Sequence, residues 1–286
     1  MILNGIEEIQ KLLPSVNLRL DSDRLNDFMS RAQQWVSDEI IGSHLEETLE
    51  AAVAEGAEDQ HARLRILVKR VIAAKAYLTF GDEMNLQLGE AGMVVQNNEA
   101  VSAASSQRRD NLMKSLADRL DYDCDALVTY LMNNSVSNGA YASWRSSEQF
   151  KELTMAFIPT LKAMRSASPT GKADALRWNE FLTRIAAMHL GLFGIASQYV
   201  SSAEIIRLMG LYRNGGLNTV QKEVVANLCC VAAGSLYDER GYAVKAAIRA
   251  RDIMLGSLAD FPDFANSDCA TLPDVSFNAG HIVDTL

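Results

Sequence analysis

One helical stretch constrains the fold of this chain more than any other part of its sequence. Residues 60–78, QHARLRILVKRVIAAKAYL, contain neither Gly nor Pro. Their apolar residues recur at three- and four-residue steps, which places them on one broad face of an α-helix of about five turns. A helix with so wide an apolar face is not stable alone and packs against other helices. The residues of this face are Leu64, Leu67, Val68, Val71, Ile72 and Leu78.

The composition agrees with a helical protein and disfavours two classes of partner. The 286 residues include only five prolines, and the formal net charge is −9. So acidic a chain is poorly suited to general nucleic-acid binding or to an anionic membrane surface, because both need Lys and Arg. No CxxC occurs, so we expect reduced thiols in a cytoplasmic compartment at Cys124, Cys229, Cys230 and Cys269. The first residues lack the basic and apolar regions of a signal peptide.

Apolar periodicity and capping residues predict an all-α, multi-helix bundle. Residues 1–138 are expected to form an N-terminal helical module and residues 139–260 a C-terminal one. The four residues Ser-Leu-Ala-Asp occur at 115–118 and again at 257–260, so two tandem repeats of one module remain an open alternative. The expected helices are 4–13, 21–41, 43–53, 60–78, 105–132, 148–164 with a break at Pro159, 173–190, 201–212, 219–237 and 241–258.

Two segments depart from the helical pattern. At 86–95, apolar residues alternate on both sides of Gly89 and Gly92, which predicts a small β-hairpin. From Phe261 to Leu286 no helical period is present and two prolines occur. We interpret residues 261–286 as an extended C-terminal arm that docks on a surface.

Motifs for catalysis or metal binding are incomplete. Asp121, Asp123 and Asp125 resemble the start of a calcium loop, but the required Gly and Glu are absent. We therefore expect a solvated helix face there. The pair Gly171-Lys172 lacks the other residues of a phosphate-binding loop. The four histidines, among them His189 in an apolar helix, have no zinc spacing. We predict no catalytic residue, no metal and no cofactor.

Lys75 is the one charged residue near the middle of the apolar face of 60–78. It fits either a side chain that reaches solvent or pairs with an acid inside the protein, or a contact at an interface.

The order of elements in the first half is informative. A capped helix ends at Ile41-Gly42, and an Ala-rich central helix precedes the hairpin around residues 89–92. A polar loop and a long helix ending in LVTYL at 127–131 follow. Over residues 1–134 this order resembles the helical head-to-tail connector, or adaptor, proteins of tailed bacteriophages and prophages, in a larger two-module variant. The role of residues 141–260 is not covered by the resemblance.

The resemblance implies a non-enzymatic virion subunit, assembled in the cytoplasm of the host bacterium. Such subunits form a ring, a dodecamer, that binds the portal protein and a tail or second connector protein. The ring extends the DNA channel, with non-specific passage of DNA and no membrane contact. The residues expected to contact the portal or other subunits are Leu88, Gly89, Glu90, Ala91, Gly92 and Met93 in the hairpin, and Phe261, Phe264, Phe277, Ile282 and Val283 in the arm.

Two other functions stay open at this point. The chain fits a helical enzyme or small-ligand-binding protein whose site has no recognisable motif. It also fits, less well, a helical adaptor in bacterial regulation.

Overall fold

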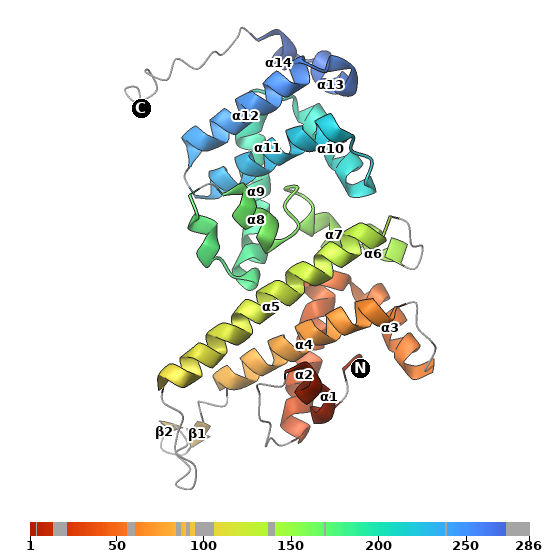
Figure 1. Ribbon diagram of the computed structural model, residues 1–286, viewed down its shortest axis with the longest axis vertical. Coiled ribbons are helices and arrows are strands. Elements are labelled where there is room, and N and C mark those ends of the chain that lie inside the picture. Colours follow the sequence, from red (N-terminus) through yellow and green to blue (C-terminus); the bar gives the residue numbers. More distant parts are fainter. Residues whose placement is uncertain are drawn as a thin grey trace. The chain divides into compact units, whose positions relative to one another are not determined.

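The computed structural model of this protein describes residues 1–3, 5–13, 22–55, 61–83, 87–89, 92–94, 106–136, 141–168, 170–237 and 239–272. These residues are mostly helical (Figure 1), which confirms the all-α class. None of the helices in this part of the chain is long and apolar enough to cross a membrane. The chain divides into two compact units, which are described separately.

The first unit comprises Met1–Leu153, Pro159–Lys162 and Ala175–Thr183. It holds the elements that the sequence predicts for the N-terminal half, together with two short helices after the long one. Its elements are α1 (Ile6–Leu12), α2 (Ser22–Val36), the π-helical turn η1 (Ser37–Ile41), α3 (Ser43–Glu55), α4 (Ala62–Glu83), β1 (Gln87–Gly89), β2 (Gly92–Val94), α5 (Ser106–Asn134), α6 (Ala142–Ser146) and α7 (Glu148–Leu153).

Helix α4 is the centre of this unit, as its wide apolar face predicts. It packs against both α2 and α5, and α1 also contacts it. Leu64, Val68 and Ile72 have no exposed surface. Burying three such side chains favours folding by roughly 1.5–3 kcal/mol each. The helix continues past the predicted end at Leu78 as far as Glu83.

The second helix ends where the sequence predicts. After α2, η1 closes with Gly42 at φ 77°, and the N–H of Gly42 donates to the carbonyl oxygen of Ser37 at 2.9 Å. Positive φ is favourable for Gly because it has no Cβ. The indole N–H of Trp144 in α6 donates to the carbonyl oxygen of Ile40 at 2.7 Å. This hydrogen bond links α6 to the end of η1.

Two three-residue strands lie between α4 and α5 in the sequence. β1 and β2 pair antiparallel, with Leu88 opposite Met93 and Gly89 opposite Gly92. Leu86, Glu90, Ala91 and Val95 of the predicted hairpin lie outside the described residues.

The second unit comprises Thr154–Ile158, Ala163–Asp174 and Arg184–Leu286. Two of its helices, α8 and α9, begin in the first unit. The break expected at Pro159 is present, because α7 ends at Leu153 and α8 begins at Leu161. The remaining elements are α8 (Leu161–Ala167), the 3₁₀ turn η3 (Lys172–Ala175), α9 (Trp178–Ala196), α10 (Ser202–Asn214), α11 (Thr219–Leu236), α12 (Arg240–Leu255), the 3₁₀ turn η4 (Leu258–Asp260), α13 (Pro262–Ala265) and α14 (Asp268–Thr271).

Close packing of small residues joins α11 to α12. Ala243, Ala247 and Ala250 of α12 are fully buried. A Cβ added at Gly234 of α11 would lie 3.2 Å from the Cβ of Ala243. Small side chains at facing positions let the two helix backbones approach, which fills the interior without voids.

The start of the expected arm is folded rather than extended. Residues 261–272 form α13 and α14, and both Phe261 and Phe264 have no exposed surface. The two rings lie three residues apart, so one helical turn places both on the same side. Glu204, itself fully buried, accepts hydrogen bonds from the N–H groups of Asp263 and Phe264 at 3.0 and 3.1 Å. This carboxylate caps α13, a contact that no local pattern predicts. Residues 273–286 lie outside the described residues.

The repeated Ser-Leu-Ala-Asp sequence has two different structures. Residues 115–118 lie inside the long helix α5, whereas Ser257 precedes the 3₁₀ turn η4. The short sequence match therefore gives no support to a structural repeat.

Candidate functional site

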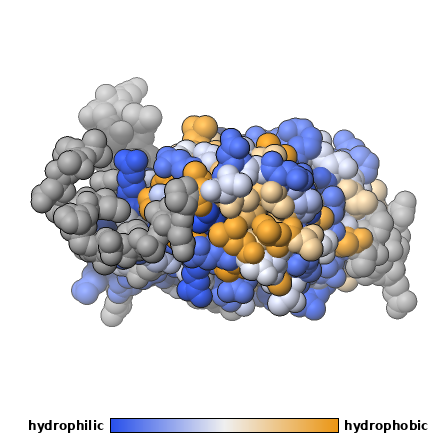
Figure 2. Space-filling view, turned by 90° about the horizontal axis from the view of Figure 1, so that it is seen from above, coloured by the Kyte–Doolittle hydropathy of each residue, from blue (hydrophilic) through white to orange (hydrophobic). Residues whose placement is uncertain are grey.

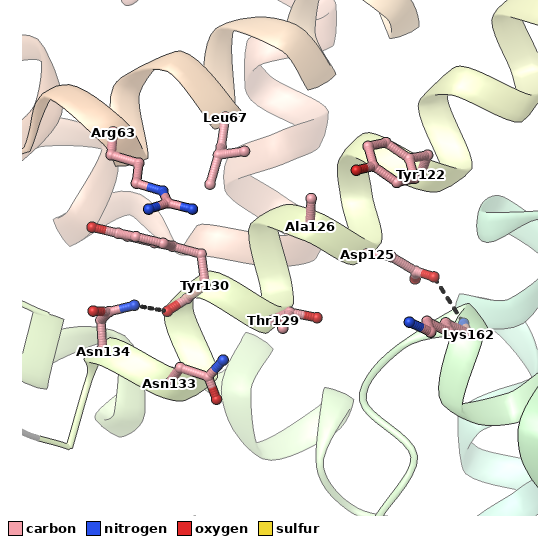
Figure 3. Close-up of a pocket in the computed structure, with 10 residues that line it drawn as sticks. All are labelled: Arg63, Leu67, Tyr122, Asp125, Ala126, Thr129, Tyr130, Asn133, Asn134 and Lys162. Carbon is pink, nitrogen blue, oxygen red and sulfur yellow. Dashed lines mark hydrogen bonds between the residues drawn. The ribbon is translucent and has the colours of Figure 1, made fainter.

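The first unit carries a surface cavity of about 440 Å³, formed by α4, α5 and the start of α8 (Figure 3). We call it the α4–α5 groove. Its volume falls within the range of small-molecule and peptide side-chain sites. The residues that give it its chemical character are Arg63, Leu67, Tyr122, Ala126, Tyr130 and Lys162.

Helical spacing places these side chains in two facing rows. Arg63 and Leu67 lie four residues apart on α4, and Tyr122, Ala126 and Tyr130 follow the same step on α5. Residues four apart share one face of a helix. Figure 3 shows Arg63 toward one end and Lys162 toward the other, with Leu67 and Ala126 between them. The groove therefore has Arg63 toward one end and Lys162 beside the Asp125 carboxylate toward the other, with Leu67 and Ala126 between them.

Both positive charges of the groove are available to a ligand. The Arg63 guanidinium lies 5.6 Å from the centre of the Tyr130 ring, which orients it by a cation–π contact. The backbone N–H of Lys162 donates to Asp125 at 2.8 Å, which fixes this residue at the start of α8 and places a carboxylate beside it. Within the described parts of the chain, neither Arg63 nor Lys162 forms an ion pair. Tyr122 is 71% exposed, an unusual degree for a large aromatic residue.

The aspartates of α5 hold the beginnings of two helices, so the expected solvated face is wrong. Asp121 is buried and accepts from the N–H of Trp178 at 2.9 Å, which caps α9. Asp125 accepts from the N–H groups of Leu161 and Lys162 at 2.8 Å each, which caps α8. Carboxylates stabilise helix N-termini through the free N–H groups and the helix dipole. One face of α5 thus holds the first residues of α8 and α9, which belong to the same unit.

Asp123 lies between these two capping residues in the sequence, but it contacts Arg119 instead of a helix N-terminus. It is buried and lies 3.5 Å from the guanidinium of Arg119. Burial raises the pKa of Asp123, and the nearby Arg119 only partly opposes this effect. In the described residues, no group of three or more His, Cys, Asp or Glu side chains is placed to hold a metal ion.

Lys75 is engaged within its own unit. Its ammonium nitrogen lies 4.3 Å from the centre of the Trp35 ring and 3.3 Å from the amide oxygen of Asn179. Burial lowers the pKa of Lys75, while Glu39 acts in the opposite direction. These contacts match the expected packing inside the protein rather than an interface.

Three exposed carboxylates form a second charged surface on the first unit. Asp38 and Glu39 lie on η1, and Glu152 lies on α7, which packs against η1. We call these three residues the acidic patch. Partial burial raises the pKa of Glu39, and the like charges of Glu152 and Asp38 raise it further. The patch is therefore electrostatically unfavourable in the isolated chain.

The second unit exposes apolar side chains on its surface. Figure 2, which looks down on the top of Figure 1, shows apolar residues gathered among hydrophilic ones. Leu190 is 72% and Ile206 is 61% exposed, and Leu258 and Leu272 are also exposed. Exposed apolar surface of this kind is typical of protein contacts when it is contiguous.

The structure places the predicted contact residues in three groups. Leu88, Gly89, Gly92 and Met93 lie in the paired strands. Phe261 and Phe264 are buried inside the second unit, so they are not available to another subunit. Glu90, Ala91, Phe277, Ile282 and Val283 lie outside the described residues.

The α4–α5 groove was not predicted from the sequence. The sequence pattern that could have indicated it is an exposed Arg or Tyr four residues before an apolar residue on a largely buried helix. Arg63 precedes Leu67 in this way on α4, and Tyr122 precedes Ala126 on α5. The pattern becomes meaningful only once α4 and α5 are known to lie side by side.

Comparison with known proteins gives one match. The family of unknown function DUF6712 matches residues 17–154, just under half of the 286-residue chain. The matched region contains α2 to α7, and therefore both rows of the α4–α5 groove and the acidic patch, but not Lys162. No curated protein and no solved structure matches the chain.

Proposed function

We propose that this protein is a structural, non-enzymatic subunit of a phage head-to-tail connector, which joins the portal to the tail and extends the DNA channel. The observation that carries the proposal is the order of elements from α2 to α5. A long helix closes at Gly42, α3 and the central α4 follow, a strand pair comes next, and long α5 completes the series. The resemblance to connector proteins rests on the same order.

The strand pair is the proposed contact element of this subunit. The pairing of Leu88 with Met93 supports a β-hairpin over residues 86–95 at the connection between α4 and α5. Two short strands are marginally stable alone. Contact with the portal, a neighbouring subunit or the channel would stabilise them. The proposed arm is now confined to residues 273–286, whose apolar residues include the predicted contacts Phe277, Ile282 and Val283.

The net charge of −9 supports the channel role. Acidic side chains along a channel repel the phosphates of DNA, so DNA slides without being held. The exposed apolar residues of the second unit support contacts with further proteins of the virion, such as a tail or second connector protein.

The test is co-expression of this chain with the portal protein encoded beside it in the same phage or prophage genome. We expect the two to copurify and electron microscopy to show a ring of this chain on the portal ring. Replacing residues 86–95 with a Gly-Ser linker should abolish copurification while leaving the first unit folded. A chain that never joins a portal, or that turns over a small molecule as a monomer, would instead favour the ligand-binding alternative.

A further inference from the structure

We propose that the α4–α5 groove of one copy binds the acidic patch of a second copy, so that copies of this chain associate head to tail. The inference deepens the proposed function and rests on it for the closure of these contacts into a ring. The contact itself can be tested without the portal.

The groove has the chemistry of a receptor for carboxylates beside apolar groups. Arg63 and Lys162 supply positive charge toward its two ends, and neither forms an ion pair among the described residues. The groove also holds the Asp125 carboxylate, whose two oxygens accept from the N–H groups of Leu161 and Lys162 at the start of α8. Leu67 and Ala126 supply an apolar middle. From Tyr122 to Asn134 the groove follows α5 for about 18 Å, at 1.5 Å per residue. That length is sufficient for a contact with the two short elements η1 and α7 of another copy, which have five and six residues.

The acidic patch has the complementary charge and is presented by a helical surface. Asp38, Glu39 and Glu152 are exposed on η1 and α7. Burial first, and then the like charges of Glu152 and Asp38, raise the pKa of Glu39. The repulsion among the three carboxylates is relieved when positive groups approach. Charge complementarity between two patches favours association and fixes its orientation.

The geometry of such a contact is heterologous. The groove and the acidic patch share no residue, so one copy uses its groove while its neighbour uses its patch. In a row of copies joined in this way, one end has a free groove and the other end has a free patch. Such a row either closes into a ring or continues to grow. Binding to a portal ring of fixed symmetry would favour a closed ring of copies over continued growth.

The experiment uses two charge-reversed forms of the full chain. The groove variant is Arg63→Glu with Lys162→Glu, and the patch variant is Asp38→Lys with Glu152→Lys. Glu39 is left unchanged because it interacts with the half-buried Lys75. Wild-type chains should associate at 50 mM salt, and each variant alone should be monomeric, with a dissociation constant raised about 100-fold or more.

Mixing the two variants gives the decisive readout. The intact groove of the patch variant matches the intact patch of the groove variant. The two reversed surfaces also carry opposite charges, so an equimolar mixture should associate again, with the two variants alternating. Analytical ultracentrifugation or mass photometry measures this directly. Circular dichroism and tryptophan fluorescence should show both variants folded. Raising the salt to 500 mM should weaken this mixed assembly, because the contact is electrostatic.

Matched controls reverse charges elsewhere. Lys114→Glu with Lys222→Glu, and Glu47→Lys with Asp268→Lys, change the net charge equally at exposed positions outside both surfaces. These variants should associate like the wild type. The inference is overturned if the wild type stays monomeric, if either test variant still associates alone, or if the mixture does not associate. Binding of a poly-glutamate peptide or of single-stranded DNA to a monomeric wild type would assign the groove to another occupant. A ring on the portal that survives Arg63→Glu with Lys162→Glu would leave the proposed function intact and remove only this interface.

Discussion

At the scale of single residues, Asp121 is the side chain that joins α5 to the start of α9. It is buried, caps α9 through the N–H of Trp178, and lies 3.0 Å from the guanidinium of Arg177. The same guanidinium also binds Asp118, which is exposed. The hydrogen bonds to both aspartates raise the pKa of Arg177, Asp118 first.

Replacing Asp121 should therefore cost far more than replacing Asp118. We expect Asp121→Ala to lower the free energy of unfolding of the first unit by about 2–4 kcal/mol, since it removes a cap and a buried partner of Arg177. Asp118→Ala should cost less than about 1 kcal/mol, because exposed ion pairs contribute little. All three tryptophans, at positions 35, 144 and 178, belong to the first unit. Urea unfolding followed by tryptophan fluorescence measures this unit, and equal losses in the two variants would refute the capping role.

The acidic patch gives a prediction for pH. Because the folded chain raises the pKa of Glu39, the folded state binds more protons than the unfolded state just above about pH 4.3. The contribution of Glu39 to stability therefore falls as pH rises through this window. Glu39→Gln removes that loss, so the variant should gain stability relative to the wild type between pH 4 and pH 7. The same urea titration at the two pH values, with monomeric protein, measures the difference. A gain that is the same at both values would contradict the assignment.

Residue-level prediction from the sequence succeeded for local features and failed for distant ones. Gly42 and Ser201 were identified as helix boundaries from their own neighbourhood, and both act as expected. The start of α11 was assigned to Thr219, whereas Asn218 is the cap, with Gln221 completing a capping box. Asp121 and Asp125 were assigned to solvent because their partners lie 36–57 residues away in the chain. No local pattern contains such a partner.

At the scale of helices, α9 and α11 of the second unit approach each other closely at Gly191 and Ser235. Gly191 of α9 faces Ser235 of α11, and a Cβ at Gly191 would lie 2.0 Å from the Oγ and 2.5 Å from the Cβ of Ser235. No short side-chain motion relieves the second contact. The absence of a side chain at residue 191 therefore determines how near the two helices can pack.

Gly191→Ala should force these helices apart. We expect a loss of about 1–3 kcal/mol in the stability of the second unit, as for other overpacked interiors. Gly194→Ala on the same helix is the control, because a Cβ there meets nothing within 4 Å. It should be neutral or stabilising by up to about 1 kcal/mol, since Ala favours helix over Gly. Hydrogen exchange of the α9 and α11 amides measures both, and Ser235→Gly should restore the protection lost in Gly191→Ala. If the two glycine variants behave alike, the close contact does not limit packing.

The helices themselves were largely predictable because their apolar residues repeat along the sequence. The strong periods of α4, α5 and α11 each give a helix in the structure. The segment 261–272 was missed because its two helices are only four residues each, too short for a period to appear. Their stability comes from burial of Phe261 and Phe264 and from the distant Glu204. The α4–α5 groove was missed for a related reason. It forms between two helices, and 22 residues of the chain lie between the end of α4 and the start of α5.

At the scale of the whole molecule, the proposal is that this chain acts only in multiple copies. The first unit carries a positive groove and a separate acidic patch, and the second unit carries exposed apolar residues. Separate complementary surfaces on one subunit are the requirement for a heterologous ring. An enzyme working as a monomer has no need of them.

The most direct measurement is the mass and shape of the particle that this chain forms when it is co-expressed with its portal protein. Native mass measurement and electron microscopy should show a closed ring of this chain on the portal, with twelve copies of the 31.4 kDa subunit. A single copy of the chain, free in solution and absent from the portal under the same conditions, would contradict the account.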